Sequence, residues 1–190
     1  MVIWENIIKK EIEEDISKRK EKKENEIWVS DLISCKKKVE FYRKFPEMFI
    51  IEPKLYIGKF IHTGIQEVLK EIYENVEIEK EVEKEIDGKI IKGRVDAILD
   101  DTILEIKYTS NTNLKEPYPH HIIQLKIYLW LTQKNKGKLI YITPNNLLEF
   151  DVDGEFKDED IIELIKNEKS PMWDWECCYC PFKPLCSQKP

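Results

Sequence analysis

Residues 93–107 read GRVDAILDDTILEIK, and this stretch predicts a β-hairpin at the centre of the fold. Two runs rich in β-branched and apolar residues flank the Asp-Asp pair at 100–101, which we expect to form a two-residue turn. That turn sets Asp96 directly opposite Glu105 on the neighbouring strand. Lys107 follows two residues later, so strand pleating places its side chain on the same face as that of Glu105.

The two opposed carboxylates of this hairpin indicate a cation site. Like charges directly across a strand pair destabilise it, because their Cβ atoms are only about 4.5–5.5 Å apart. A hard divalent ion would compensate the repulsion between Asp96 and Glu105, with the ammonium of Lys107 beside it. In the same register Arg94 lies opposite Lys107, and two cations there suggest a nearby phosphate. The alternative is an exposed hairpin face whose charges are simply solvated, since 36% of the residues are charged.

Composition indicates one folded domain. The chain has 190 residues, of which 42% are hydrophobic and 11% aromatic, so it can bury a core and is not disordered. No apolar run approaches the roughly 20 residues that cross a bilayer, and the N-terminus lacks the features of a signal peptide. We therefore expect a cytoplasmic protein with no membrane contact. Within a single domain over 1–190, we expect a charged N-terminal helix (1–27), a core (28–170) and a cysteine-rich tail (171–190).

The net charge of −6 argues against a broad basic surface that coats nucleic acid. It leaves room for a local basic groove, because phosphate contacts need only a few well-placed cations. The candidate basic cluster consists of Lys36, Lys37, Lys38, Arg43 and Lys44. A solvated helix face is the alternative interpretation of this cluster.

Hydrophobic periodicity and turn residues predict the remaining elements. Helices are expected over residues 3–24, 30–43, 54–74, 120–134 and 158–168. Strands are expected over residues 76–86, 89–99, 102–109, 138–143 and 147–152. This order predicts an α/β (α+β) fold with a mixed central sheet flanked by helices.

Clustered cysteines in a chain expected to be intracellular indicate a metal site before they indicate disulfides. Cys177 and Cys180 form a C-x-x-C step, Cys186 follows six residues later, and Cys35 supplies a fourth thiolate. Four thiolates suffice for a cubane iron–sulfur cluster or a structural zinc, and the spacing does not distinguish them. Cys178 is then a bystander or a replacement for Cys177. A shared metal would join segments about 140 residues apart, whereas unligated thiols in an exposed tail are the alternative.

Together these residues resemble a known family. His62, Asp96, the Glu105-Ile106-Lys107 triplet, and Gln124 with Tyr128 resemble the RecB-type nuclease motifs of the PD-(D/E)xK superfamily. With the four cysteines added, the chain is similar to the CRISPR-associated Cas4 exonucleases. The resemblance covers about residues 28–186 and implies a restriction-endonuclease-like core, in which an iron–sulfur cluster joins the N-terminal helical region to the C-terminal tail.

The resemblance also implies roles for individual residues. The metal ligands for Mn²⁺ or Mg²⁺ would be His62, Asp96, Glu105 and the backbone carbonyl of Ile106. Lys107 would orient or activate the attacking water, while Gln124 and Tyr128 would approach the substrate or support the site. A [4Fe–4S] cluster would be held by Cys35, Cys177, Cys180 and Cys186.

The function implied by the resemblance is a metal-dependent DNA exonuclease that hydrolyses single-stranded DNA ends and prepares spacer precursors in CRISPR adaptation. Its partners would then be single-stranded DNA and an adaptation integrase, and homo-oligomerisation is left open. A stand-alone or virus-encoded repair nuclease is an alternative. A non-catalytic iron–sulfur scaffold that binds DNA is another, and the intact set of site residues argues against it. A redox protein would explain the cysteines but not the hairpin carboxylates.

Overall fold

The computed structural model describes residues 3–48, 53–154 and 156–187. The chain divides into two compact units. The smaller unit combines residues 1–26, 34–52 and 167–190, and the larger unit combines residues 27–33 and 53–166. The single domain expected from the sequence, with its three parts, stays a prediction.

A six-stranded mixed sheet forms the centre of the larger unit. Its strands are β1 (Glu26–Trp28), β2 (Val76–Ile86), β3 (Lys89–Leu99), β4 (Thr102–Tyr108), β5 (Lys136–Ile142) and β6 (Leu147–Asp153). The order is β1-β3-β4-β5-β6, with β2 also paired to β3. The β4–β5 pair is parallel, whereas the β2–β3, β3–β4 and β5–β6 pairs are antiparallel. The predicted mixed sheet is confirmed; only the three-residue β1 was not predicted.

The hairpin of β3 and β4 has the predicted register over its first residues. Leu99 pairs with Thr102, and Ile98 pairs with Ile103. Asp100 adopts a φ of +54°, in the left-handed region that aspartate tolerates better than most residues, so the Asp-Asp pair does form the turn. In the described chain, the paired positions end at Ala97 and Leu104. That register, extended by one position, places Asp96 opposite Glu105, and this opposition stays a prediction.

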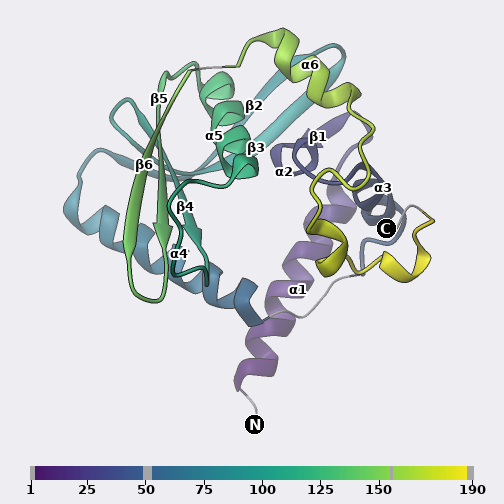
Figure 1. The fold of residues 1–190 in the computed structure, drawn as a ribbon, viewed down its shortest axis with the longest axis horizontal. Coiled ribbons are helices and arrows are strands. Elements are labelled where there is room, and N and C mark those ends of the chain that lie inside the picture. Colours follow the sequence, from purple (N-terminus) through teal and green to yellow (C-terminus); the bar gives the residue numbers. More distant parts are fainter. Residues whose placement is uncertain (1–2, 49–52, 155, 188–190) are drawn as a thin grey trace. The chain divides into compact units, whose positions relative to one another are not determined.

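Among its described residues, the larger unit also has four helices: α2 (Val29–Leu32), α4 (Pro53–Ile72), α5 (Pro119–Thr132) and α6 (Asp158–Lys166). Helix α5 connects the parallel strands β4 and β5, which need a long crossover connection, and it packs against the sheet together with α4 (Figure 1). Leu125, Ile127 and Leu129 are fully buried in α5, in agreement with its apolar sequence. A Cβ atom at Gly93 would lie 2.5 Å from Cε1 of Tyr128, so glycine allows this ring to lie against β3.

The smaller unit contains α1 (Ile3–Glu21), α3 (Lys36–Lys44) and two short 3₁₀ helices, η1 (Glu176–Tyr179) and η2 (Lys183–Leu185). Its centre is aromatic, because the fully buried Phe182 stacks on Phe41 at 5.1 Å and meets the Tyr42 ring edge-on at 4.8 Å. Arg19 of α1 lies 4.1 Å from the centre of the Tyr42 ring. Segments far apart in sequence therefore share one small core.

The helix predicted over residues 30–43 is in fact two helices. Helix α2 ends at Leu32, and α3 begins at Lys36 with Cys35 as its N-cap residue. The backbone of Cys35 is not helical, with φ −49° and ψ 122°. This break places Cys35 at the start of a helix rather than inside one.

Candidate functional site

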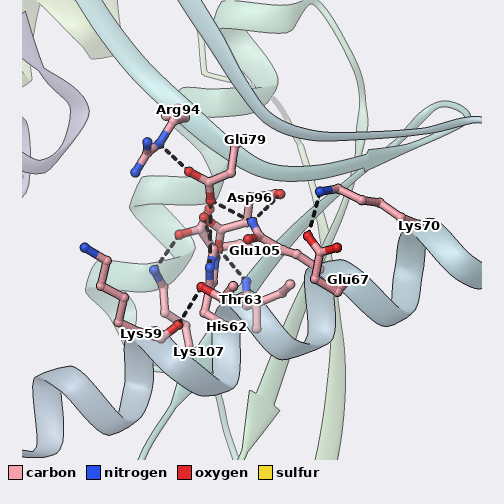
Figure 2. A network of polar contacts seen from close by, with 12 residues as sticks. Lys59, His62, Thr63, Glu67, Lys70, Glu79, Arg94, Asp96, Glu105 and Lys107 are labelled. Carbon is pink, nitrogen blue, oxygen red and sulfur yellow. Dashed lines mark hydrogen bonds and ion pairs between the residues drawn. The ribbon is translucent and has the colours of Figure 1, made fainter. Parts of the chain in front are cut away.

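The polar site of the larger unit draws its side chains from four elements (Figure 2). Helix α4 supplies His62, β2 supplies Glu79, β3 supplies Asp96, and β4 supplies Glu105 and Lys107. Figure 2 shows these side chains directed toward one another. The structure therefore brings together the four side chains predicted from sequence at this site and adds a third carboxylate.

His62 links two of the carboxylates. Its Nε2 lies 3.0 Å from Oδ1 of Asp96, and its Nδ1 lies 3.8 Å from Oε1 of Glu79. Burial lowers the pKa of His62, but the hydrogen bond and charge of Asp96 and the charge of Glu79 outweigh burial, so the pKa is raised above its ordinary value. One ligand atom from each of the three residues lies within 4.8 Å of the other two, which is close enough for one metal ion.

Glu79 was missed because nothing local distinguishes it in the alternating charged run of β2. Its φ of +53° lies in the left-handed region, which non-glycine residues rarely adopt and which recurs at functional sites. The buried Gln66, one helical turn after His62, donates from Nε2 to Glu79 Oε1 at 2.6 Å and to the backbone carbonyl of Asp96 at 2.9 Å. The two hydrogen bonds of Gln66 thus connect α4 to β2 and β3.

The paired positions of β3 and β4 end before Arg94 and Lys107, so the expected placement of these two cations opposite each other stays a prediction. Across β2, Arg94 pairs with Glu81. The Nε atom of Arg94 lies 2.5 Å from Oε2 of Glu79. A phosphate near Arg94 and Lys107 likewise stays a prediction.

Glu105 is fully buried with one oxygen unbonded. Its Oε1 accepts a hydrogen bond from Nζ of Lys107 at 2.5 Å, but in the described part of the chain its Oε2 has no partner. Burial, and then the charge of Asp96, raise the pKa of Glu105 to about 7 against the lowering effect of Lys107. An unsatisfied buried oxygen costs about 1–3 kcal/mol or more, so a cation or a hydrogen-bond donor at Oε2 would stabilise this carboxylate.

Asp96 replaces a sheet hydrogen bond with its own side chain. Its Oδ2 accepts the N–H of Ile106 at 2.8 Å, at the point where the paired positions of β3 and β4 have ended. The other oxygen, Oδ1, is the one near His62. The Asp96 side chain is therefore oriented by Ile106 of β4 on one side and by His62 of α4 on the other. The hydrogen bond from the N–H of Ile106 also holds the backbone of that residue next to Asp96.

Gln124 and Tyr128 are on α5, and Tyr128 is buried. Burial, and then the charge of Glu105, raise the pKa of Tyr128, while hydrogen bonding with Gln124 lowers it. The phenol therefore stays neutral near physiological pH. The charge of Glu105 therefore acts on Tyr128, which in turn contacts Gln124, and the role of the two residues in substrate contact stays a prediction.

The four predicted cysteine ligands line one cavity of the smaller unit, of about 400 Å³ including the part open to solvent. The cavity is lined by Cys35, Cys177, Cys180 and Cys186, together with charged and aromatic neighbours. Burial, and then the charges of Cys35, Cys180 and Cys186, raise the pKa of Cys177, which reflects their proximity. Cys178 is exposed and does not line this cavity.

No protein-family model matches the chain. Over an alignment of 203 residues, which covers 99% of both proteins, the chain is 37% identical to the CRISPR-associated exonuclease Cas4 of Saccharolobus solfataricus. The chain belongs to the Cas4 family of CRISPR-associated exonucleases. It is thus a nuclease, as predicted from its motifs.

Solved structures agree with membership of the Cas4 family. The crystal structure of SSO0001 aligns with a TM-score of 0.89 and 36% identity, over 99% of this chain and 97% of the other. The alkaline exonuclease LHK-Exo from Laribacter hongkongensis aligns with a TM-score of 0.56 and 16% identity, over 80% and 87% of the two chains. At that low identity the second match shows the fold alone, and it confirms the predicted nuclease-type fold.

A nuclease of the Cas4 family implies a divalent metal ion, and the donors present fit one. Carboxylate oxygens and an imidazole nitrogen are ligands that Mn²⁺ and Mg²⁺ accept. His62, Glu79 and Asp96 are spaced for coordination, and the unbonded oxygen of Glu105 would gain a partner from a cation. The soft thiolates of the smaller unit fit an iron–sulfur cluster or zinc instead.

A second acid that the sequence did not indicate lies in the cysteine site. Glu176 is 3% exposed, and its Oε1 accepts the backbone N–H of Cys35 at 2.8 Å. Its position directly before Cys177 is the only signal in the sequence that could have drawn attention to it.

No helix in the described residues has both the length and the apolar character to cross a membrane.

Proposed function

We propose that this chain is a divalent-metal-dependent DNA exonuclease that hydrolyses phosphodiester bonds at single-stranded DNA ends. Membership of the Cas4 family supports the further proposal that it trims spacer precursors in CRISPR adaptation, with an adaptation integrase as partner. The observation that carries the proposal is the buried, half-bonded Glu105 beside the group of His62, Glu79 and Asp96. Such a site needs a cation to satisfy it.

The divalent ion would be held by His62, Asp96, Glu105 and the carbonyl of Ile106, with Glu79 as a further ligand or as a support for His62. When bound, such an ion supplies Lewis acidity for phosphodiester hydrolysis. The hydrogen bond from the Ile106 N–H orients Asp96, which leaves its Oδ1 directed toward His62.

Lys107 acts as a charged group rather than as a general base in this proposal. Burial lowers its pKa, but the charges of Glu105 and Asp96 outweigh burial and raise the pKa above the ordinary value. The ammonium therefore keeps its proton at neutral pH. It would orient the attacking water or offset negative charge on the phosphate.

Gln124 and Tyr128 would support this chemistry from α5. Because the phenol of Tyr128 stays neutral, it can donate a hydrogen bond to a phosphate or to Glu105. Gln124, one helical turn earlier, would hold the phenol in place. The close approach of Tyr128 to Gly93 keeps the ring against β3.

In the smaller unit, Cys35, Cys177, Cys180 and Cys186 would hold a [4Fe–4S] cluster. Their convergence on one cavity supports this assignment. The cluster would be structural, since it would link the start of α3 to the segment that follows residue 167.

Anaerobic digestion of end-labelled single-stranded DNA with Mn²⁺ or Mg²⁺ tests the nuclease proposal. Asp96→Ala should reduce the rate by about 100-fold or more, because it removes a ligand and the support of Ile106. Asp101→Ala is the matched control, since Asp101 lies in the same hairpin with an 86% exposed side chain. DNA binding without cleavage by cluster-loaded wild type would favour a non-catalytic scaffold instead.

The substrate proposal needs a second DNA in the same assay. A duplex with single-stranded overhangs imitates a spacer precursor, and we expect trimming of the overhangs while the duplex survives. Equal digestion of blunt duplex DNA would contradict the preference for single-stranded ends. The position of the surviving label gives the polarity of digestion.

A further inference from the structure

Cys35 caps α3 without using its side chain. The first N–H groups of a helix lack partners within the helix, and an N-cap side chain usually accepts one of them. The Cys35 side chain makes no such hydrogen bond. Residues 169–176 supply the acceptors for the first three N–H groups instead: Glu176 Oε1 for Cys35 (2.8 Å), the Lys169 carbonyl for Lys36 (3.2 Å) and Ser170 Oγ for Lys37 (3.1 Å).

Because residues 169–176 accept the N–H groups at the start of α3, the thiol of Cys35 stays available for ligation. A serine or aspartate at the N-cap would satisfy the helix but could not supply a thiolate. Here the C-terminal segment performs the capping, and it does so only when it lies against the start of α3. The cap and the cysteine site therefore form together.

The Glu176 carboxylate contacts donors from both sequence segments that form the cysteine site, residues 35–38 and residues 172–173. Its Oε1 accepts the N–H of Cys35, and Nζ of Lys38 lies 3.6 Å from the same oxygen. Its Oε2 accepts the N–H groups of Met172 at 2.8 Å and Trp173 at 3.0 Å. A buried carboxylate with three N–H donors and an ammonium is well compensated, whereas the loss of its charge would leave those donors poorly satisfied.

We propose that Glu176 is a positioning residue for the cysteine site, holding Cys35 in register with Cys177 before any metal binds. Glu176 directly precedes Cys177 and bonds to Cys35, which is 141 positions away in sequence. Its effect on a cluster rests on the proposed [4Fe–4S] assignment, whereas its effect on the metal-free chain does not.

Two consequences follow from the position of Glu176. First, folding rather than metal binding closes the long loop between Cys35 and Cys177, so the site is preorganised for its ligand. Second, Glu176 lines the same cavity as the four cysteines and adds a negative charge there. A negative charge near a cluster disfavours its reduced form, because reduction adds an electron to the cluster.

Chelator resistance and reduction potential test the effect on the loaded protein. Wild type is reconstituted anaerobically with iron and sulfide, as are Glu176→Gln and Glu176→Ala in the full chain. Cluster absorption at about 400 nm is then followed. Both variants should lose iron to a chelator about tenfold faster than wild type. The potential of Glu176→Gln should move to a more positive value, which a merely structural defect would not predict. Glu168→Gln is the matched control, since Glu168 is 75% exposed and 3.8 Å from Lys36.

Thiol labelling of the metal-free chain tests the positioning role without any cluster. Cys35 is 8% exposed, so it should react slowly with a maleimide in wild type and several-fold faster in Glu176→Gln. Mass spectrometry of the Cys35 peptide gives the rate, and far-UV circular dichroism verifies that the variant is folded. Unchanged Cys35 labelling overturns the proposal. Absence of cluster absorption in wild type would instead overturn only the [4Fe–4S] assignment.

Discussion

Glu105 in the larger unit and Glu176 in the smaller unit are both buried acids, but their oxygens are satisfied to different degrees. Both oxygens of Glu176 accept backbone N–H groups. Glu105 shares one oxygen with Lys107, and its other oxygen has no partner in the described chain. A fully bonded buried acid acts as part of the scaffold, whereas an acid with an unbonded oxygen is prepared for a ligand.

The surrounding donors differ in the same way. The site around Glu105 offers carboxylates and an imidazole, which suit a hard divalent ion. The site around Glu176 offers thiolates, which suit iron–sulfur clusters or zinc. Substitutions should therefore separate the two sites, with ion binding and catalysis lost from one and the bound cluster lost from the other.

The largest expected effect comes from Glu105→Gln. Removal of the negative charge should lower nuclease activity by about 1,000-fold, since a metal ligand is lost from the buried site. Mn²⁺ binding measured by titration calorimetry should weaken, while visible absorption of the cysteine site stays unchanged. Glu149→Gln, at a 61% exposed side chain on β6, is the control. Parallel loss of cluster absorption would show that the two sites are not independent.

Cys180→Ser should have the converse effect. We expect about tenfold or greater loss of bound iron, because one of four thiolates is removed from the cavity. Mn²⁺ binding to the larger unit should persist. Cys178→Ser is the matched control, since this neighbouring thiol is exposed and lies outside the lining. Equal iron loss from both variants would contradict the assignment of ligands.

Glu79→Gln tests the carboxylate that the sequence did not reveal. It removes a charge 3.8 Å from His62 and weakens the pair with Arg94, so we expect about tenfold weaker Mn²⁺ binding. Glu77→Gln, two residues earlier on β2 and 55% exposed, should bind Mn²⁺ as wild type does. Identical affinities in the two variants would remove Glu79 from the site.

The smallest effect concerns acid stability of the larger unit. Burial, and then the charges of Lys107 and His120, lower the pKa of His121 to about 2, so the folded chain keeps this ring neutral beside the Tyr141 hydroxyl. The unfolded chain protonates this ring at about pH 6.5, so the free energy of unfolding is constant above that pH and falls as pH decreases toward 2. Allowing for partial exposure, the loss should be about 1 kcal/mol at about pH 5.5.

Urea unfolding of wild type and His121→Asn at two pH values measures this contribution. The variant should lose less stability between about pH 7.5 and pH 5.5, by about 1 kcal/mol. Its cysteine site should respond to pH as the wild-type site does, since His121 belongs to the larger unit. An identical pH dependence in the two proteins would show that His121 is not the group responsible.

Sequence reasoning succeeded where structure depends on short-range periodicity. The register of Leu99 with Thr102 followed from the turn, because strand pairing repeats every two residues. The same reasoning failed to predict that the Asp96 side chain accepts the N–H of Ile106. It also failed at Cys35, where a helix break depends on acceptors supplied from residues 169–176.

The chemistry of the donors can be read from the residues alone: carboxylates, an imidazole and a lysine around one hairpin, and four cysteines at a spacing suited to a metal. Folding established which acids are buried and which oxygens are satisfied, and it added Glu79 to the first site and Glu176 to the second. This is because donor type is a property of each residue. Burial and hydrogen bonding instead depend on neighbours brought together by folding, and these set the free energy of a buried charge.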